Sequence, residues 1–338
     1  MTTSWIPSSI NASENWGKEV VMRYDTSLQS NGTFYTDSNG MELIKRVYNK
    51  RGPSYPDPYN ISEEVAGNYY PINAMISIDD GVNELAILTD VSVAGGSLSS
   101  GSAELMVHRR LQDDDSRGVQ EPLNETMCGC NDINADPGNM GEHGHEGDGG
   151  CECVGLTMRG RQWLVFDNMN DAHETRRQIA EKLYFPPTLG FTTSENVAIP
   201  STSYLNEDLP RNVKIQSLTN NYAAHNNKQL LLRLSHLYQV GEHTTLSKPV
   251  DVDLEKVFGK TGLKIASATE VSLTANQLVE EMDAKKHNWK TAPLNERVEE
   301  NLHEAKIKRN GFNSRIPFNF PVVTMRPMEV RTFLVRFD

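Results

Sequence analysis

Apolar residues recur at every second position through most of this chain, and glycine, asparagine and aspartate separate the alternating runs. A period of two is typical of half-buried antiparallel strands, because successive side chains of a strand point to opposite faces of the sheet. We predict strands over residues 19–24, 34–37, 72–78, 84–88, 104–111, 155–167, 228–240 and 329–337. The Asp80-Gly81 dipeptide between two of them predicts a hairpin turn. The chain should therefore be mainly β, with antiparallel β-sandwich domains and few short helices.

Helical periodicity is rare in the sequence. The best candidate helix covers residues 171–185, because Asn170 or Asp171 can cap it and a pair of prolines follows it. One further helical turn is expected over residues 254–258, where a glycine would close it. A short helix is also expected within the charge-rich insertion at residues 280–310.

A polar, proline-containing stretch at residues 198–212 indicates a boundary between two folding units. We predict a large β-sandwich over residues 1–199, with a cysteine-containing loop inserted at residues 127–154. A second, C-terminal β-sandwich is predicted over residues 200–338. With 338 residues, the chain is long enough for each unit to bury a core of its own.

Acidic side chains outnumber basic ones, 45 to 33, which gives a formal net charge of −12 at pH 7. Such a surface would repel nucleic acid and anionic membranes, so we expect neither as a partner. No apolar run approaches the roughly 18–20 residues that cross a bilayer. Residues 1–9 contain neither a basic segment nor an apolar core, so we do not expect them to be a signal peptide.

Four N-x-S/T sequons, at Asn11, Asn31, Asn60 and Asn124, lie in polar, turn-rich stretches where an oligosaccharide could be attached. The four cysteines form two C-x-C pairs and none stands alone, which also favours an oxidising compartment. A glycosylated chain without a signal peptide is most simply a proteolytic product of a longer secreted precursor. The sequence thus indicates the secretory pathway.

The cysteines lie at the two ends of one loop, with Cys128 and Cys130 before a glycine-rich segment and Cys151 and Cys153 after it. One interpretation is a tetrahedral metal site that also uses histidines of the loop. The other is a hairpin excursion held by two disulfides, for example Cys128 to Cys153 and Cys130 to Cys151. We favour the disulfides, because the spacing is not the CxxC of zinc ribbons. The sequence alone does not fix their connectivity.

A charged run, residues 109–118, follows one of the predicted strands and contains three successive carboxylates and then Arg117. An ordinary solvated turn with internal ion pairs would explain it. A loop aimed into a polar cleft would also explain it. There, Arg117 would donate hydrogen bonds to sugar hydroxyls while a neighbouring carboxylate, Asp114 or Asp115, holds it in place.

No complete catalytic apparatus is recognisable in the sequence. It contains no HExxH, GxSxG, P-loop or strand-associated GxGxxG motif, and nothing singles out two of the 45 acidic residues as a glycosidase pair. His236 lies in a predicted strand and is expected to be a hydrogen-bonded core residue. We therefore expect neither a catalytic residue nor a metal ligand on this chain.

Several segments resemble, in order, the C-terminal third of glycoside hydrolase family 38, the zinc-dependent retaining α-mannosidases. Residues 34–40 (FYTDSNG) resemble the family's FYTDxNG, residues 67–71 its GNYYP, and residues 105–118 its RRL…DDxRG stretch. The LRLSH…VGE of residues 232–242 and the MEVRTF of residues 328–333 resemble the lysosomal branch. The cysteine loop differs from the animal lysosomal pattern and resembles plant-type vacuolar enzymes.

This resemblance implies a division of labour. In the family, the zinc ligands and the nucleophilic aspartate belong to an N-terminal domain, so zinc is expected on a partner chain from the same precursor. The assembled enzyme would hydrolyse terminal α-mannose from N-glycans with retention of configuration. On this chain, Arg117 is expected to contact substrate at the rim of the cleft with Asp114 orienting it, and Tyr35 is a weaker candidate.

We accordingly expect the C-terminal, β-rich chain of a two-chain α-mannosidase of the vacuole or lysosome. It would pack on the catalytic chain, and the two-chain unit would form a dimer. The alternative, from a different class, is a free-standing carbohydrate-binding β-sandwich protein without catalytic activity. The two hypotheses differ in whether the natural protein co-purifies with a larger chain that carries zinc and α-mannosidase activity.

Overall fold

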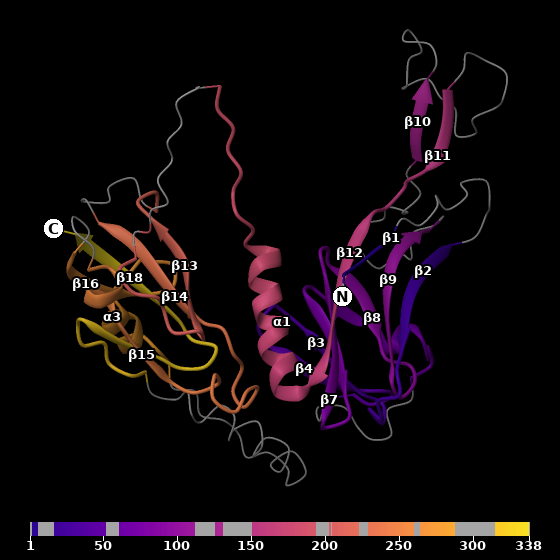
Figure 1. Ribbon diagram of the computed structural model, residues 1–338, viewed down its shortest axis with the longest axis horizontal. Coiled ribbons are helices and arrows are strands. Elements are labelled where there is room, and N and C mark those ends of the chain that lie inside the picture. The colour runs from indigo at the N-terminus through magenta and orange to yellow at the C-terminus, as the bar shows by residue number, and fades with distance from the viewer. Residues whose placement is uncertain are drawn as a thin grey trace. The chain divides into compact units, whose positions relative to one another are not determined.

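The computed structural model describes residues 2–5, 17–51, 61–111, 126–130, 151–193, 203, 205–222, 229–259, 264–287 and 315–337. Backbone contacts divide the chain into two compact units, one of Met1–Lys50 with Asn60–Ala172 and one of Arg51–Tyr59 with His173–Asp338. Figure 1 draws the strands of the first unit in indigo to magenta and those of the second in orange and yellow. The predicted boundary between residues 199 and 200 lies outside the described residues and stays a prediction.

Two antiparallel sheets make up most of the first unit. The six-stranded sheet has the order β1 (Thr2–Trp5), β12 (Gly160–Asn168), β7 (Asn83–Thr89), β6 (Met75–Asp79), β3 (Thr33–Asp37) and β4 (Leu43–Val47). The four-stranded sheet has the order β2 (Lys18–Asp25), β9 (Ser102–Arg110), β8 (Val93–Gly96) and β5 (Tyr70–Ile72), and a 3₁₀ turn, η1 (Ala66–Asn68), precedes β5. Phe34, Ile76 and Ile87 of the first sheet form one buried cluster with Ile72 and Leu105 of the second. Burial between the two sheets therefore forms the core of this unit.

One predicted strand, residues 72–78, is divided into β5 and β6, which belong to different sheets. The cause is Asp37, which is only 1% exposed at the end of β3. Its Oδ1 accepts hydrogen bonds from the backbone N–H groups of residues 73–75 at 2.9, 2.8 and 3.0 Å, and its Oδ2 accepts one from Gly40 at 2.7 Å. Because these amides bind a side chain at this point, the chain can turn from one sheet to the other.

The predicted strand at residues 155–167 is also divided. β11 (Cys151–Gly155) pairs only with β10 (Thr126–Cys130) in a separate two-stranded ribbon, whereas β12 begins at Gly160 and joins the six-stranded sheet. Figure 1 shows this ribbon extending beyond the other strands of the unit. The two strands differ in their pairing partners, β10 for β11 and β7 for β12. Alternation of apolar residues gives no information about the pairing partner, so the sequence did not predict this division.

The hairpin predicted at Asp80-Gly81 is confirmed between β6 and β7, where Asp79 pairs with Glu84. Gly81 has φ +86°, a left-handed conformation that favours glycine. The Asp80 carboxylate accepts hydrogen bonds from the backbone N–H groups of Asn83 at 2.8 Å and Val82 at 2.9 Å, which lower the pKa of Asp80. The turn is therefore closed by its own side chain.

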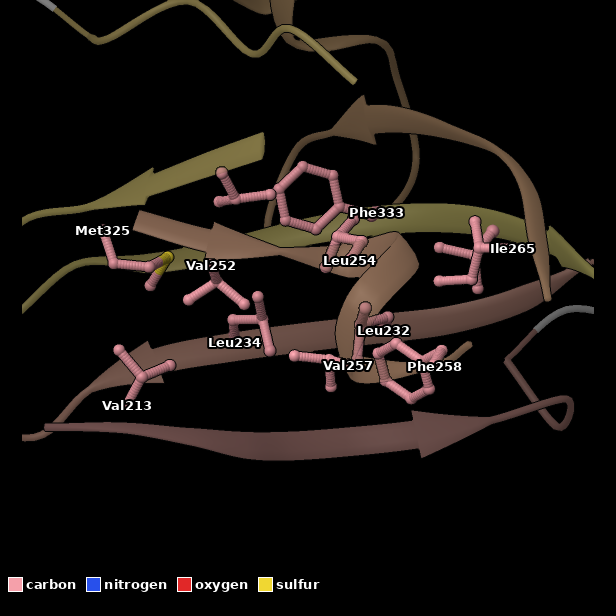
Figure 2. Packing of buried hydrophobic residues seen from close by; sticks show 12 residues of the cluster. Val213, Leu232, Leu234, Val252, Leu254, Val257, Phe258, Ile265, Met325 and Phe333 are labelled. Atoms are coloured by element: carbon pink, nitrogen blue, oxygen red, sulfur yellow. The ribbon is translucent and has the colours of Figure 1, made fainter. Parts of the chain in front are cut away.

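The second unit contains a four-stranded antiparallel sheet and a two-stranded sheet. The larger sheet has the order β13 (Val213–Thr219), β14 (Leu230–His236), β18 (Val330–Phe337) and β16 (Ile265–Val271), and β15 (Val250–Asp253) pairs with β17 (Val322–Met325). Figure 2 shows the buried cluster that joins them, with Leu232 and Leu234 of β14, Phe333 of β18 and Val252 of β15. The prediction of a mainly β, antiparallel sandwich protein with few short helices is confirmed.

The predicted helix at residues 171–185 is confirmed as α1 (Met169–Tyr184). Its predicted cap was wrong by about half a turn. The side chain of Asn168 accepts a hydrogen bond from the N–H of Asp171 at 3.3 Å, which is the usual arrangement between an N-cap residue and the third helical position. The two predicted caps, Asn170 and Asp171, lie inside the first turn.

Two further helices within the described residues are short, as expected. In α2 (Leu254–Val257), Asp253 caps the N-terminus by accepting from the N–H groups of residues 255 and 256 at 3.1 and 3.2 Å. The helix α3 (Val279–Ala284) stands at the start of the predicted insertion 280–310. The rest of that insertion, from residue 288, lies outside the described residues.

We predict that Asp37→Ala lowers the free energy of unfolding by about 3 kcal/mol or more, because four backbone N–H groups lose their acceptor at a buried site. Urea unfolding of the purified protein measures it. Asp208→Ala, which removes an exposed carboxylate, is the control and should change little. A change for Asp37→Ala as small as that of the control would contradict a structural role for this carboxylate.

Candidate functional site

The predicted substrate contacts, Arg117 and Asp114, lie outside the described residues, but the strand that leads to them is described. That strand, β9, pairs with β2 from Lys18↔Arg110 to Asp25↔Ser102, and β8 pairs with its other edge. Arg109, at the start of the charged run, forms an ion pair with Glu19 of β2 at 2.9 Å. The charged run thus begins at the end of β9, where residues 109 and 110 pair with β2.

A buried carboxylate on β9 links this strand to a second family-like motif. Glu104 is only 3% exposed and accepts a hydrogen bond from Nε of Arg23 at 2.7 Å. It also accepts one from the hydroxyl of Tyr69, which belongs to the GNYYP segment. Burial, and after it the hydrogen bond to Glu104, raises the pKa of Tyr69, so the phenol stays protonated and donates.

The neighbouring Asn68 is also structural. It is fully buried, and its side-chain oxygen accepts from the N–H of Asn49 at 2.8 Å. Its amide nitrogen donates to the carbonyl oxygen of Glu64 at 2.7 Å and to Oδ1 of Asn49 at 2.8 Å. Three hydrogen bonds therefore hold two turns together at this residue. Tyr35, the weaker candidate, is half-buried on β3 opposite Ser77, and its suggested role stays a prediction.

In the second unit, Glu242 lies between two arginines of α1. Its Oε1 accepts from Nη2 of Arg176 and Nε of Arg177, both at 2.8 Å, and its Oε2 accepts from Nη2 of Arg177 at 2.7 Å. The N–H of Gln239 donates to Oε2 at 2.7 Å, and Nδ1 of His173 contacts the carbonyl oxygen of Glu242. The carboxylate and both guanidinium groups are 3–4% exposed.

This environment changes the acidity of Glu242 strongly. Burial alone would raise its pKa, but the charges and hydrogen bonds of Arg177 and Arg176 outweigh it and lower the pKa from 4.5 to about 2. The VGE segment of the lysosomal branch thus supplies the carboxylate that fixes α1 to the loop after β14. Its function in this unit is to hold the fold together.

A second buried ion pair crosses the sheet of this unit. Arg331 of β18 is fully buried and binds Glu270 of β16 through two parallel hydrogen bonds, at 2.7 and 2.6 Å. Arg315 binds the same carboxylate at 2.7 Å, and Nη1 of Arg331 donates to the carbonyl oxygen of Thr324 at 2.9 Å. A bidentate pair of this kind is geometrically specific, so it fixes the positions of β16, β17 and β18.

The expectation for His236 is confirmed. It is fully buried in β14, and its Nδ1 accepts a hydrogen bond from the N–H of Tyr238 at 3.2 Å. The proton is therefore on Nε2, which lies 3.1 Å from the carbonyl oxygen of Lys248 and donates to it. Burial lowers the pKa of His236, so the ring is neutral at pH 7.

Sequence reasoning did not find the Glu242 and Glu270 clusters. Arg331 carried the clearest signal, because it is a charged residue at an inward position of an alternating strand. Glu242 carried no such signal, since its partners lie more than 60 residues earlier on a helix. Among the described residues, no three His, Cys, Asp or Glu side chains lie close enough together to hold a metal ion.

Of the four predicted glycosylation sites, Asn31 lies within the described residues. It is exposed at φ +50°, in a turn that the N–H of Thr33 closes by donating to the carbonyl oxygen of Ser30 at 2.8 Å. Its side chain is therefore accessible to glycosylation, which stays a prediction. Asn11, Asn60 and Asn124 lie outside the described residues. No helix among the described residues is long and apolar enough to cross a membrane.

Both units are built from antiparallel sheets, and their buried polar clusters stabilise the fold. The chain is therefore of the antiparallel β-sandwich class. Residues 8–117 match the glycosyl hydrolases family 38 C-terminal domain, and residues 212–333 match the family 38 C-terminal beta sandwich domain. The chain belongs to the C-terminal region of glycoside hydrolase family 38. The resemblance noted from its short motifs is thereby confirmed at the level of the family.

Full-length relatives agree with this assignment. The chain is 36% identical over 97% of its length to alpha-mannosidase At3g26720 of Arabidopsis thaliana and 36% identical over 98% to lysosomal alpha-mannosidase of Homo sapiens. It is 35% identical over 95% to alpha-mannosidase of Canavalia ensiformis. It spans only 29%, 28% and 30% of these relatives. Because plant and animal relatives match equally well, the plant-type assignment stays a prediction.

A solved structure supports the fold. The crystal structure of an alpha-mannosidase from Enterococcus faecalis V583 matches 95% of this chain with a TM-score of 0.51. Sequence identity is 12%, and the match covers 26% of that chain. The likeness therefore concerns the arrangement of the backbone.

We predict that Glu242→Gln lowers the free energy of unfolding by about 3–5 kcal/mol at pH 7, because two buried arginines lose their counter-charge. The folded pKa of about 2 lies below the ordinary 4.5, so this stability is present above pH 4.5 and is lost as the pH falls towards 2. The difference between wild type and variant should therefore shrink over that interval. Urea unfolding at several pH values measures it.

The control for this experiment is Glu207→Gln, which neutralises an exposed glutamate of the same unit. It should leave stability at pH 7 nearly unchanged. If Glu242→Gln and Glu207→Gln have equal effects, or if the Glu242 effect does not depend on pH between 4.5 and 2, the ion-pair interpretation is wrong.

Proposed function

We propose that this chain is the C-terminal, β-rich chain of a two-chain, zinc-dependent, retaining α-mannosidase of the vacuole or lysosome. The enzyme would remove terminal α-mannose from N-glycans. One observation carries the mannosidase part of the proposal: nearly the whole chain aligns with named α-mannosidases at about 35% identity. The chain spans less than a third of the length of these relatives. The remaining part of such an enzyme would be the partner of this chain.

The chemistry would be carried by that remaining part. A retaining glycosidase needs two carboxyl groups about 5–5.5 Å apart that face the substrate. The largely buried carboxylates of Asp37, Glu104, Glu242 and Glu270 are each already bound to backbone amides, to a tyrosine or to arginines. They stabilise the two units, and we assign none of them to catalysis. A zinc ion bound by the catalytic part would supply contacts to the sugar hydroxyls.

An exposed apolar segment supports association with another polypeptide. After α1 the chain is extended, and Phe185, Leu189 and Phe191 are 54%, 81% and 96% exposed. Apolar groups gathered in one exposed segment are a feature of interaction sites. We assign this segment, residues 185–191, to the interface with the catalytic part, because more than two thirds of each relative lies outside the present chain. An interface that holds two cleaved chains together should bury more than about 2,000 Å².

The contribution of this chain to substrate binding would come from Arg117. Its guanidinium group would donate hydrogen bonds to sugar hydroxyls at the rim of the cleft, and Asp114 would orient it. The support for this assignment is that residues 105–118 resemble the family's motif and that β9 holds the start of this run in a fixed position. Glycans on Asn11, Asn31, Asn60 and Asn124 would be consistent with passage through the secretory pathway.

The competing proposal is a free-standing carbohydrate-binding β-sandwich. Purification of the native protein separates the two, because only a two-chain enzyme would bring with it a larger chain, zinc and α-mannosidase activity. A monomeric native chain that binds glycans and carries no activity would overturn the mannosidase proposal.

We predict that Leu189→Asp weakens association between this chain and the catalytic part. A buried carboxylate without a partner at an interface costs several kcal/mol, so on size-exclusion chromatography the two chains should already separate at a higher concentration than in the wild type. Leu273→Asp is a matched control, because Leu273 is a 58% exposed leucine in a turn of the same unit. Equal behaviour of the two variants would remove residues 185–191 from the interface.

We predict that Arg117→Ala lowers kcat/KM of the assembled enzyme on a small α-mannoside by about 10- to 100-fold, the equivalent of one hydrogen bond to a charged group. The melting temperature should stay close to that of the wild type. Arg159→Ala, at an exposed arginine of the same unit, is the control and should leave both unchanged. Unchanged kinetics for Arg117→Ala would sink the assignment of Arg117 to the cleft.

A further inference from the structure

The ribbon of β10 and β11 contains all four cysteines of the chain and lies outside both regions that match the family. Its backbone register places Cys128 directly opposite Cys153 and Cys130 directly opposite Cys151. We propose that the ribbon carries two nested cross-strand disulfides, Cys128–Cys153 and Cys130–Cys151. Together they close a covalent ring around residues 131–150. The proposal does not depend on the enzymatic activity of the protein.

Directly opposite residues of an antiparallel ladder have the spacing that a disulfide requires. Their Cα atoms lie about 4.5 or 5.5 Å apart, depending on the type of pair, and disulfides join Cα atoms about 4.4–6.8 Å apart. The two pairs are two residues apart along each strand, so both are of the same type and both share one face of the ribbon. The register thus offers two equivalent positions for a disulfide.

Four cysteines allow three connectivities, and the register disfavours the other two. Diagonal pairs, Cys128 with Cys151 and Cys130 with Cys153, would join Cα atoms about 7–8 Å apart, which is beyond the normal range. Pairs within one strand would join residues whose Cβ atoms point the same way, about 6.6 Å apart, whereas a disulfide needs about 3.8 Å. The sequence alone could not make this choice, because it does not contain the register.

The same geometry argues against a tetrahedral zinc site in the ribbon. Four thiolates bound at about 2.3 Å would have to lie about 3.8 Å from one another. Zinc ribbons reach this by placing each pair of cysteines in a CxxC turn, whereas here both C-x-C pairs are in extended strands. The extended backbone instead pairs each cysteine with the one across from it.

Each bond forms when two thiols lose two protons and two electrons to a protein or small-molecule disulfide, which is thereby reduced to two thiols. Either bond alone closes the ring around residues 131–150. The second bond then encloses only the one residue of each strand that lies between the pairs, so it adds little loop closure. Nesting therefore makes the ring redundant: both disulfides must be reduced before it opens.

Paired serine substitutions in the full chain test the connectivity. Cys128→Ser with Cys153→Ser, and Cys130→Ser with Cys151→Ser, should each leave one disulfide and no free thiol when the denatured protein is titrated with a thiol reagent. The crossed variants, Cys128→Ser with Cys151→Ser and Cys130→Ser with Cys153→Ser, leave cysteines that are diagonal in the register. They should show two free thiols each.

The unsubstituted protein should show no free thiol and no bound zinc, and its intact mass should increase by four hydrogens on reduction. Four free thiols, or one zinc ion released as four thiols appear, would overturn the proposal. Free thiols in the register-matched variants together with disulfides in the crossed ones would overturn the connectivity. None of these outcomes depends on mannosidase activity, so they are separate from the test of the proposed function.

Redundancy is tested by inserting a protease recognition sequence between Met140 and Gly141 and cutting the chain there. On a denaturing, non-reducing gel, the two fragments should remain joined in the wild type and in both register-matched variants. They should separate in the variant with all four cysteines replaced by serine. Separation in either register-matched variant would contradict a nested pair.

Discussion

A carboxylate removed from water must find N–H donors or cations, and much of this chain is arranged around that requirement. In the first unit, Asp37 accepts four backbone hydrogen bonds where the chain passes from β5 to β6, and so from one sheet to the other. In the second unit, Glu242 binds an arginine of α1, and Glu270 of β16 binds Arg331 of β18. Arg331 also donates a hydrogen bond to Thr324 of β17. Apolar burial supplies the driving force for folding. The buried carboxylates determine where the chain changes direction and which elements meet.

The same residues explain what could be predicted from the sequence. The predicted strands came from alternation along one sheet, which is a local pattern. Several observed strands, among them β13 and β16, were not predicted. The division at residues 73–75 was missed, because it results from Asp37, which lies more than 30 residues earlier. The cap of α1 was misplaced for a related reason. Several consecutive polar residues could each cap the helix, and only the backbone geometry shows that Asn168 is the cap.

The candidate site was predicted only in part, and for a physical reason. A motif match shows that a residue occurs in a certain context, but it does not separate a group that holds the fold from one that contacts a ligand. Asp37, Asn68 and Glu242 all belong to family-like motifs, and in each case the side chain is buried and bound to its own chain. Within the described residues, family resemblance thus marks structural polar groups. The proposed ligand contact, Arg117, follows one of the strands that these groups support.

Two buried groups, His236 and Glu242, lose their contributions to stability over different pH ranges as the pH falls, which matters for a protein proposed to work in an acidic compartment. The folded pKa of His236 lies below the ordinary 6.5, so the unfolded chain binds this proton first and stability declines as the pH falls below 6.5. Glu242 keeps its full contribution down to about 4.5, because its folded pKa is about 2. Between these values stability is lost at His236 but not at the Glu242 ion pair, which does not yet titrate. Glu242 keeps its ion pairs in mild acid because the guanidinium groups of Arg176 and Arg177 stay charged throughout this range.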